Sequence, residues 1–172
     1  MFEDIKVLYS QEKIQKRIAE LAKEIDEDYE GKVVTVISIL KRAVFFTVDL
    51  VKNMKTPIEL EVMQVSSYEG TSSTQKINVK KDLDNSIEGK DVLIVEDNID
   101  TGYTLKYLKE YLLSKNPNSL KIAVLADKKE RREVDVDIDY TGFEIPNKFV
   151  IGYGFDYNEK GRNLPYIGYI EN

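Results

Sequence analysis

The chain has 172 residues, 42% apolar and 33% charged, which predicts one ordinary globular domain over residues 1–172 rather than a disordered chain. It contains no cysteine, which excludes disulfides and thiolate metal sites, and no histidine, so proton transfer near neutral pH must use other side chains. The net charge of −6 argues against nucleic acid as a partner, and no run approaches the ~20 apolar residues of a membrane span. We therefore expect a cytoplasmic protein that binds neither nucleic acid nor membrane.

The N-terminal third of the chain predicts a helix followed by a buried strand. Residues 10–28 are amphipathic, with Ser10 as the expected N-cap and Gly31 as the expected stop. The continuous β-branched run at 33–40 is typical of a strand buried on both faces. The next expected elements are a helix at 43–54, a strand at 58–65 and a polar, mobile loop at 66–75.

The second half continues the alternation and then changes character. A buried strand at 91–97, a helix at 102–115 and another buried strand at 120–126 predict an α/β fold with a mostly parallel central sheet flanked by helices. From Tyr140 onward the chain consists of short aromatic segments broken by glycines, with strands expected at 149–151 and 165–167. This tail predicts a small appendage over the sheet rather than a second domain.

The segment 92–105 carries the strongest functional pattern. Four apolar residues lead to Glu96 and Asp97 at the C-terminal end of a strand, which is the edge of a parallel sheet where ligands bind. Asp100 follows in a turn that opens a helix, whose first amides are free to bind an anion. Acids for hydroxyls or a metal, and amides for a phosphate, together suit a sugar phosphate. In the alternative interpretation Asp100 or Thr101 only caps the helix and the acids are solvated. The expected phosphate donors are Thr101, Gly102, Tyr103 and Thr104.

This segment resembles the signature of type I phosphoribosyltransferases, and its surroundings resemble the hypoxanthine–guanine branch of that family. The similarity runs from Val33 to the C-terminus, with its motifs in family order. The fold expected from it is the type I phosphoribosyltransferase fold, with a core at about 33–140 and a hood from about 1–10 and 141–172. The other similar motifs are Leu40-Lys41, Val65-Ser66-Ser67-Tyr68, Ala126-Asp127-Lys128, the stretch 142–146, the stretch 149–157 and Arg162-Asn163-Leu164-Pro165.

The resemblance implies a reaction between phosphoribosyl pyrophosphate (PRPP), with Mg²⁺, and a 6-oxopurine. The products would be a purine nucleotide and pyrophosphate. A chain of net charge −6 needs a metal ion to bind so highly charged an anion. The resemblance also implies a homodimer or homotetramer. The helix at 43–54 is expected near the interface, because it has more apolar residues than one buried face of a helix needs.

Roles for individual residues follow from the family register. Glu96 and Asp97 would hold the ribose hydroxyls and help to place magnesium, which Asp156 would also bind. Asp100 would be the general base, and the loop from Asp100 to Thr104 would wrap the 5′-phosphate. Pyrophosphate would be bound by Lys41, Arg42 and Arg162. The purine would be bound by Asn98, Lys128, Phe149, Val150 and Asp156. A lid would extend over Ser66 to about Val79, with Ser67 and Tyr68 near its start.

Four of these residues have ordinary alternatives when the resemblance is set aside. Lys128 lies in a charged run typical of a solvated surface, and Phe149 on a strand is by default part of a core. Asp156 is also compatible with a turn, and Arg162 with an exposed cation.

Three positions depart from the family pattern. Arg42 stands where relatives have a glycine, after a lysine preceded by a non-proline cis peptide; it adds a cation but fills space. Asn98 replaces an aliphatic residue that packs on the purine, and Gly161 replaces a bulkier, often aromatic, residue. Two other functions therefore stay open: a weakly active or non-enzymatic protein that binds PRPP or nucleotide, and a transferase with altered base specificity.

Overall fold

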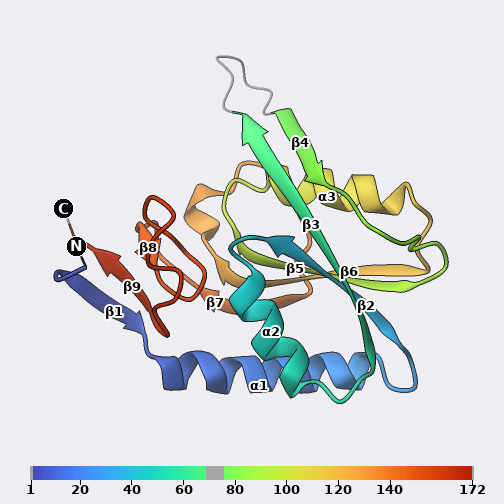
Figure 1. Cartoon of the computed structure of the whole chain (residues 1–172), viewed down its shortest axis with the longest axis horizontal. Helices are drawn as coiled ribbons and strands as arrows, with labels where there is room; N and C mark the ends of the chain where they lie inside the picture. The colour runs from blue at the N-terminus through green and yellow to red at the C-terminus, as the bar shows by residue number, and fades with distance from the viewer. Residues whose placement is uncertain (1, 69–75, 172) are drawn as a thin grey trace.

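The computed structural model describes residues 2–68 and 76–171 and contains a sheet of six strands, a smaller sheet of three strands and three α-helices (Figure 1). None of the helices in these two ranges has the length and apolar character needed to cross a membrane. In chain order the elements are β1 (Ile5–Tyr9), α1 (Gln11–Asp28), β2 (Val34–Leu40), α2 (Val44–Asn53), β3 (Ile58–Tyr68), β4 (Lys76–Lys81), β5 (Asp91–Ile99), α3 (Tyr103–Leu113), β6 (Ser119–Asp127), a 3-10 turn (Lys129–Arg131), β7 (Tyr140–Glu144), β8 (Val150–Ile151) and β9 (Ile167–Ile170).

The large sheet has the order β4-β3-β2-β5-β6-β7, in which only β4 is antiparallel to its neighbour. Its central strands alternate between two buried faces. One face, with Val36, Leu93 and Leu125, packs against α1 and α2; the other, with Ile94 and Val124, packs against α3. Burial on both faces explains the uninterrupted apolar runs, and the predicted α/β fold class is confirmed.

The first helix forms as the sequence predicts. Ser10 is its N-cap, and the Ser10 hydroxyl accepts a hydrogen bond from the Lys13 amide at 3.2 Å. The cap at the other end is Tyr29, two residues before the expected stop at Gly31. Near this end the Asp26 carboxylate accepts hydrogen bonds from the amides of residues 55–56. One fully buried apolar stripe, each member of which contributes about 1.5–3 kcal/mol, comprises Ile14, Ile18, Leu21 and Ile25.

The strand before the predicted mobile loop is longer than expected, and the strand after it, β4, was not predicted. Residues 66–68 continue β3 and pair with β4, with Ser67 opposite Ile77, so the prediction of a loop there was wrong. The hydrogen bonds of the hairpin hold these polar residues in a strand although the sequence has no apolar alternation there. Residues 69–75, the rest of that predicted loop, lie outside the described residues.

The second sheet joins the two ends of the chain, which lie side by side in Figure 1. Its order is β1-β9-β8, with β1 and β9 antiparallel. We call β1, β8, β9 and the segments between β8 and β9 the hood. The hood meets α2 through Tyr153, whose hydroxyl donates to the Phe45 carbonyl at 3.3 Å and bonds the Asp49 carboxylate. It meets β7 through the stacked rings of Tyr9 and Phe143.

Candidate active site

The C-terminal end of β5 brings two acids to the edge of the sheet, and both are nearly buried. Glu96 is 7% exposed and Asp97 4%. Burial, and then the neighbouring charge of Asp97, raise the pKa of Glu96 well above its usual value. The Asp97 amide donates to Glu96 Oε1 at 3.2 Å, but Asp97 Oδ2 is buried and accepts no hydrogen bond from the described residues. A buried carboxylate oxygen without a donor is costly, so this edge is suited to a hydroxyl or a cation.

The loop after β5 leads directly into α3 and presents backbone amides to the same edge. Gly102 is the N-cap of α3, and no side chain caps the helix. In the described parts of the chain, no hydrogen-bond acceptor is found for the amides of residues 101–104. Because the first amides of a helix lack partners within it and its dipole is positive at this end, the loop can bind an anion.

The packing of the protein itself requires glycine at position 102, in addition to the predicted need for ligand access. Its φ is +100°, and a Cβ atom there would lie 2.6 Å from the Val134 carbonyl oxygen. The amides of Glu133 and Val134 both donate to the Thr101 carbonyl, at 2.9 and 3.1 Å. The loop is thus braced by the segment after β6, a role for Gly102 that the sequence did not indicate.

Asp100 lies beside a cation that the sequence analysis did not select. Its Oδ1 is 2.9 Å from Nε of Arg131, although the N–H is not aligned for a hydrogen bond. The Arg132 Nε donates to the Asp100 carbonyl at 3.1 Å, and the Arg132 guanidinium pairs with Asp127. These arginines position the loop from the side of β6. They were missed because the run 128–132 has the composition of an exposed surface.

Lys128 is buried, although it begins this charged run. It is 9% exposed, and burial lowers the pKa of its ammonium group while the Asp100 carboxylate acts in the opposite direction. Its amide donates to the Ile99 carbonyl at 3.0 Å, which ties it to the end of β5. The solvated alternative for Lys128 was therefore wrong. A partly desolvated ammonium group next to the edge is suited to an oxygen acceptor on a ligand.

Two further cations, Lys41 and Arg162, come from the loop after β2 and from the hood. The Leu40–Lys41 peptide bond is cis, in agreement with the expectation from the resemblance. Lys41 Nζ lies 3.2 Å from Glu159, a residue the sequence analysis did not select. Arg162 is 17% exposed, pairs with Asp156 at 3.4 Å, and donates to the Gly154 carbonyl at 2.9 Å, so it is no ordinary surface cation.

Asp156 is held by several donors in the hood. Burial alone would raise its pKa, but the Glu159 amide and the guanidinium groups of Arg162 and Arg42 outweigh burial and lower it. The Glu159 amide donates to Asp156 Oδ2 at 2.9 Å, which accounts for a turn at this position as well. The Arg42 guanidinium lies between Asp156, at 3.2 Å, and Asp97, at 3.8 Å.

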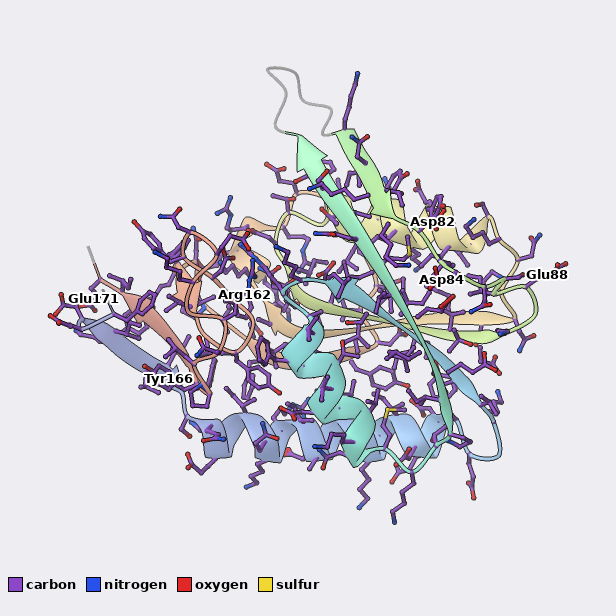
Figure 2. All side chains as sticks on the ribbon, viewed as in Figure 1. Asp82, Asp84, Glu88, Arg162, Tyr166 and Glu171 are labelled. Carbon is purple, nitrogen blue, oxygen red and sulfur yellow. The ribbon has the colours of Figure 1, made fainter. Side chains whose placement is uncertain are left out.

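One pocket of about 480 Å³ lies where these groups meet. Figure 2 labels Arg162, which lines it from the hood, beside the ends of the central strands. Unpredicted lining residues include Gln64, Lys80 and Glu159. The predicted site residues that line it are Lys41, Arg42, Ser67, Glu96, Asp97, Asn98, Asp100, Thr101, Gly102, Thr104 and Arg162, whereas Tyr103, Lys128, Phe149, Val150 and Asp156 do not. The side chain of Tyr68 lies outside the described part.

Phe149, which was predicted to bind the purine, is exposed to solvent. Phe149 is 53% exposed and makes an edge-to-face contact with Tyr157, with ring centroids 5.8 Å apart, so it is not a core residue. The next residue, Val150, is buried in β8. An aromatic face left exposed beside a buried strand is available for stacking.

Two of the three departures from the family pattern have structural explanations. Gly161 has φ +89°, and a Cβ there would lie 2.6 Å from Ile151 Cδ1, so Ile151 already fills the space of a larger side chain. Arg42 is not among the described residues with positive φ, so its backbone does not require glycine. Asn98 is half-buried, pairs with Ala126 in the sheet and lines the pocket, and nothing in the structure explains why it is polar.

Comparison with known proteins agrees with this geometry. The family model for the phosphoribosyl transferase domain matches residues 4–158. The chain belongs to that family. The resemblance inferred from the sequence is thus confirmed.

Similar phosphoribosyltransferases match almost the whole chain. The hypoxanthine-guanine phosphoribosyltransferase of Aquifex aeolicus is 48% identical over 170 residues, covering 98% of this chain and 96% of the relative. That of Streptococcus agalactiae is 46% identical over 167 residues, covering 96% and 93%. The crystal structure of a hypoxanthine phosphoribosyltransferase from Staphylococcus aureus has a TM-score of 0.95 and 46% identity, covering 99% of this chain and 94% of that one.

Proposed function

We propose that this phosphoribosyltransferase transfers the 5-phosphoribosyl group of PRPP to hypoxanthine and/or guanine, giving the nucleotide and pyrophosphate in purine salvage. Relatives with this activity in their names match over nearly their full length. The observation that carries the proposal is the composition of one pocket. Buried acids at the end of β5, free amides at the start of α3 and cations from the β2–α2 loop and the hood all face it.

Each part of PRPP has a chemically suitable partner in that pocket. The amides of residues 101–104 would bind the 5′-phosphate, together with the hydroxyls of Thr101 and Thr104. Glu96 and Asp97 would accept hydrogen bonds from the ribose hydroxyls. Lys41 and Arg162 would bind the pyrophosphate, which needs charge neutralisation as it leaves.

The acids of the pocket fit Mg²⁺. Asp97 offers a buried oxygen without a hydrogen-bond donor, and Asp156 faces the same guanidinium as Asp97. The described residues contain no group of three acids placed to hold a metal ion on their own, so oxygens of the substrate would have to complete its coordination. We propose that Glu96, Asp97 and Asp156 bind it. Bound Mg²⁺ would neutralise charge on the pyrophosphate.

The purine would bind between the exposed ring of Phe149 and Asn98. Lys128 would donate to the 6-oxo group, and Val150 would offer its backbone. As the bond from purine nitrogen to ribose carbon forms and the bond to pyrophosphate breaks, Asp100 would take the proton from the imidazole ring. Its 33% exposed side chain is close enough to the pocket to reach a ligand there.

The β3–β4 hairpin is a candidate lid, although its described residues form regular strands. Ser67 lines the pocket from this hairpin, and Tyr68 is the last residue of β3. Bending of the hairpin over the pocket would exclude water from the reaction.

Assembly and cellular location are further parts of the proposal. The outer face of α2 exposes Val44, Phe45 and Val48, a contiguous apolar patch on a helix that otherwise packs inward. Such a patch is typical of a contact between copies, so we propose a homodimer or homotetramer. The chain would act as one domain in the cytoplasm. Its core extends past the predicted limit at about residue 140, because β7 belongs to the large sheet, and the hood consists of β1, β8, β9 and the segments between β8 and β9.

A panel of bases tests the proposed activity. Purified protein with PRPP and Mg²⁺ is assayed spectrophotometrically with hypoxanthine, guanine, xanthine, adenine and uracil. We expect turnover with hypoxanthine and guanine and little with the other three bases. Preference for xanthine or uracil would show altered base specificity, and no turnover with any base would favour a protein that only binds PRPP.

A further inference from the structure

The guanidinium of Arg42 bridges two acids that come from different parts of the fold. Its Nη1 lies 3.8 Å from Asp97 Oδ2 at the end of β5, and its Nη2 lies 3.2 Å from Asp156 Oδ1 in the hood. The two carboxylates are nearly buried, with side chains 6% and 13% exposed, whereas that of Arg42 is 47% exposed. A half-exposed cation therefore lies between two nearly buried anions.

The two acids depend on Arg42 to different extents. Asp156 also accepts from the Glu159 amide at 2.9 Å and pairs with Arg162 at 3.4 Å. Asp97, by contrast, forms an ion pair with Arg42 and with no other described residue, and its Oδ2 accepts no hydrogen bond. A charge buried in this way must be compensated, so another cation would bind strongly if Arg42 were absent.

The main chain keeps Arg42 close to this position. Its carbonyl packs against Gly154 of the hood, where even a Cβ would lie 2.1 Å from the oxygen. The next residue, Ala43, is fully buried and is the N-cap of α2. The guanidinium can therefore leave the acids by side-chain rotation, but its point of attachment stays beside them.

We infer that Arg42 is a built-in counter-ion that takes the place of a divalent cation between Asp97 and Asp156 and competes with one for these carboxylates. The inference rests on the proposed function, because only a PRPP-binding enzyme needs the metal there. It gives Arg42 a role distinct from direct pyrophosphate binding: it sets how much free divalent metal the site requires.

Mn²⁺ binding to the free protein tests this without any turnover. The electron paramagnetic resonance signal of hydrated Mn²⁺ falls as the ion binds, so a titration gives the dissociation constant. Arg42→Gln removes the charge but keeps most of the side chain, and it should bind Mn²⁺ at least about tenfold more tightly than the wild type. Arg42→Lys, which keeps a compact charge, should lie between the two.

Arg131 provides a matched control. Its side chain is 48% exposed and pairs with Asp100 in the same pocket region, but it contacts neither Asp97 nor Asp156. Arg131→Gln should leave the Mn²⁺ affinity within about twofold of the wild type, since a half-exposed charge that contacts neither carboxylate is screened by solvent and salt. Adding Asp156→Asn to Arg42→Gln should remove the gain.

Two results would overturn the inference. One is an Mn²⁺ affinity of Arg42→Gln within twofold of the wild type, including no binding by either protein. The other is an equal gain in Arg42→Gln and Arg131→Gln, which would reflect net charge alone. Failure of the proposed function would appear separately, as absence of transfer in the wild type whatever its Mn²⁺ affinity.

Discussion

Alanine at Gly154 should damage the junction between the hood and the core, and through it the binding of PRPP. Gly154 has φ +100°, and a Cβ there would lie 2.1 Å from the Arg42 carbonyl oxygen, although contacts under 3.0 Å are essentially never observed. The left-handed backbone costs about 1–2 kcal/mol with a side chain, and overpacking adds about 1–3 kcal/mol. We therefore expect Gly154→Ala to lower the free energy of unfolding by about 2–5 kcal/mol.

Gly89 offers a control that separates the two costs. It has φ +72°, but a Cβ there would have no atom within 4 Å, so Gly89→Ala bears only the backbone strain. Urea unfolding followed by circular dichroism should show a loss of about 1–2 kcal/mol for this variant. Its KM for PRPP should be unchanged, whereas that of Gly154→Ala should rise several-fold, because a shift of the Arg42 main chain also moves Lys41, the proposed pyrophosphate ligand.

Equal stabilities and equal KM values for the two variants would refute this reasoning. They would show that the hood can shift away from Arg42 without consequence for the pocket.

Three further predictions concern catalysis, assembly and acid stability. Asp100→Asn should lower kcat about 10²-fold or more while the affinity for PRPP stays within a few-fold, and unchanged turnover would exclude Asp100 as the base. Val48→Glu on α2 should yield monomers in sedimentation at micromolar concentration, whereas Leu113→Glu, equally exposed on α3, should not; a monomeric wild type would refute the interface. Burial alone would raise the pKa of Asp26, but the hydrogen bonds it accepts outweigh burial and lower it, so its stabilisation is present above the unfolded pKa and lost as pH falls through the folded pKa. Asp26→Asn should therefore be less stable than the wild type by about 1–2 kcal/mol at pH 7 and equal to it in strong acid, while Glu27→Gln, an exposed neighbour, should follow the wild type throughout.

The sequence predicted the parts of the fold whose signals are local. The start of helix α1 could be placed to within a residue because Ser10 caps it and its apolar stripe is continuous. Strands β2, β5 and β6 were found because burial on both faces leaves short runs that are mostly apolar. The course of residues 66–68 could not be predicted, since their strand depends on pairing with β4 rather than on their own composition.

The candidate site also contains residues that could be predicted from the sequence and residues that could not. Glu96 and Asp97 stand out because two acids end a buried strand, and the structure places both at the pocket. Arg131 could not be selected, because its composition is that of a surface and only the fold brings it to Asp100. The same holds for Glu159, whose contact with Lys41 joins segments far apart in the sequence.

The most direct test of the proposed transfer is a ³¹P nuclear magnetic resonance time course with PRPP, Mg²⁺ and hypoxanthine. The proposed function predicts that the PRPP signals disappear while a nucleotide 5′-monophosphate and pyrophosphate appear in equal amounts, and that omission of hypoxanthine stops the reaction. PRPP that stays intact, or that yields pyrophosphate and ribose 5-phosphate without nucleotide, would contradict the assignment of this chain as a purine phosphoribosyltransferase.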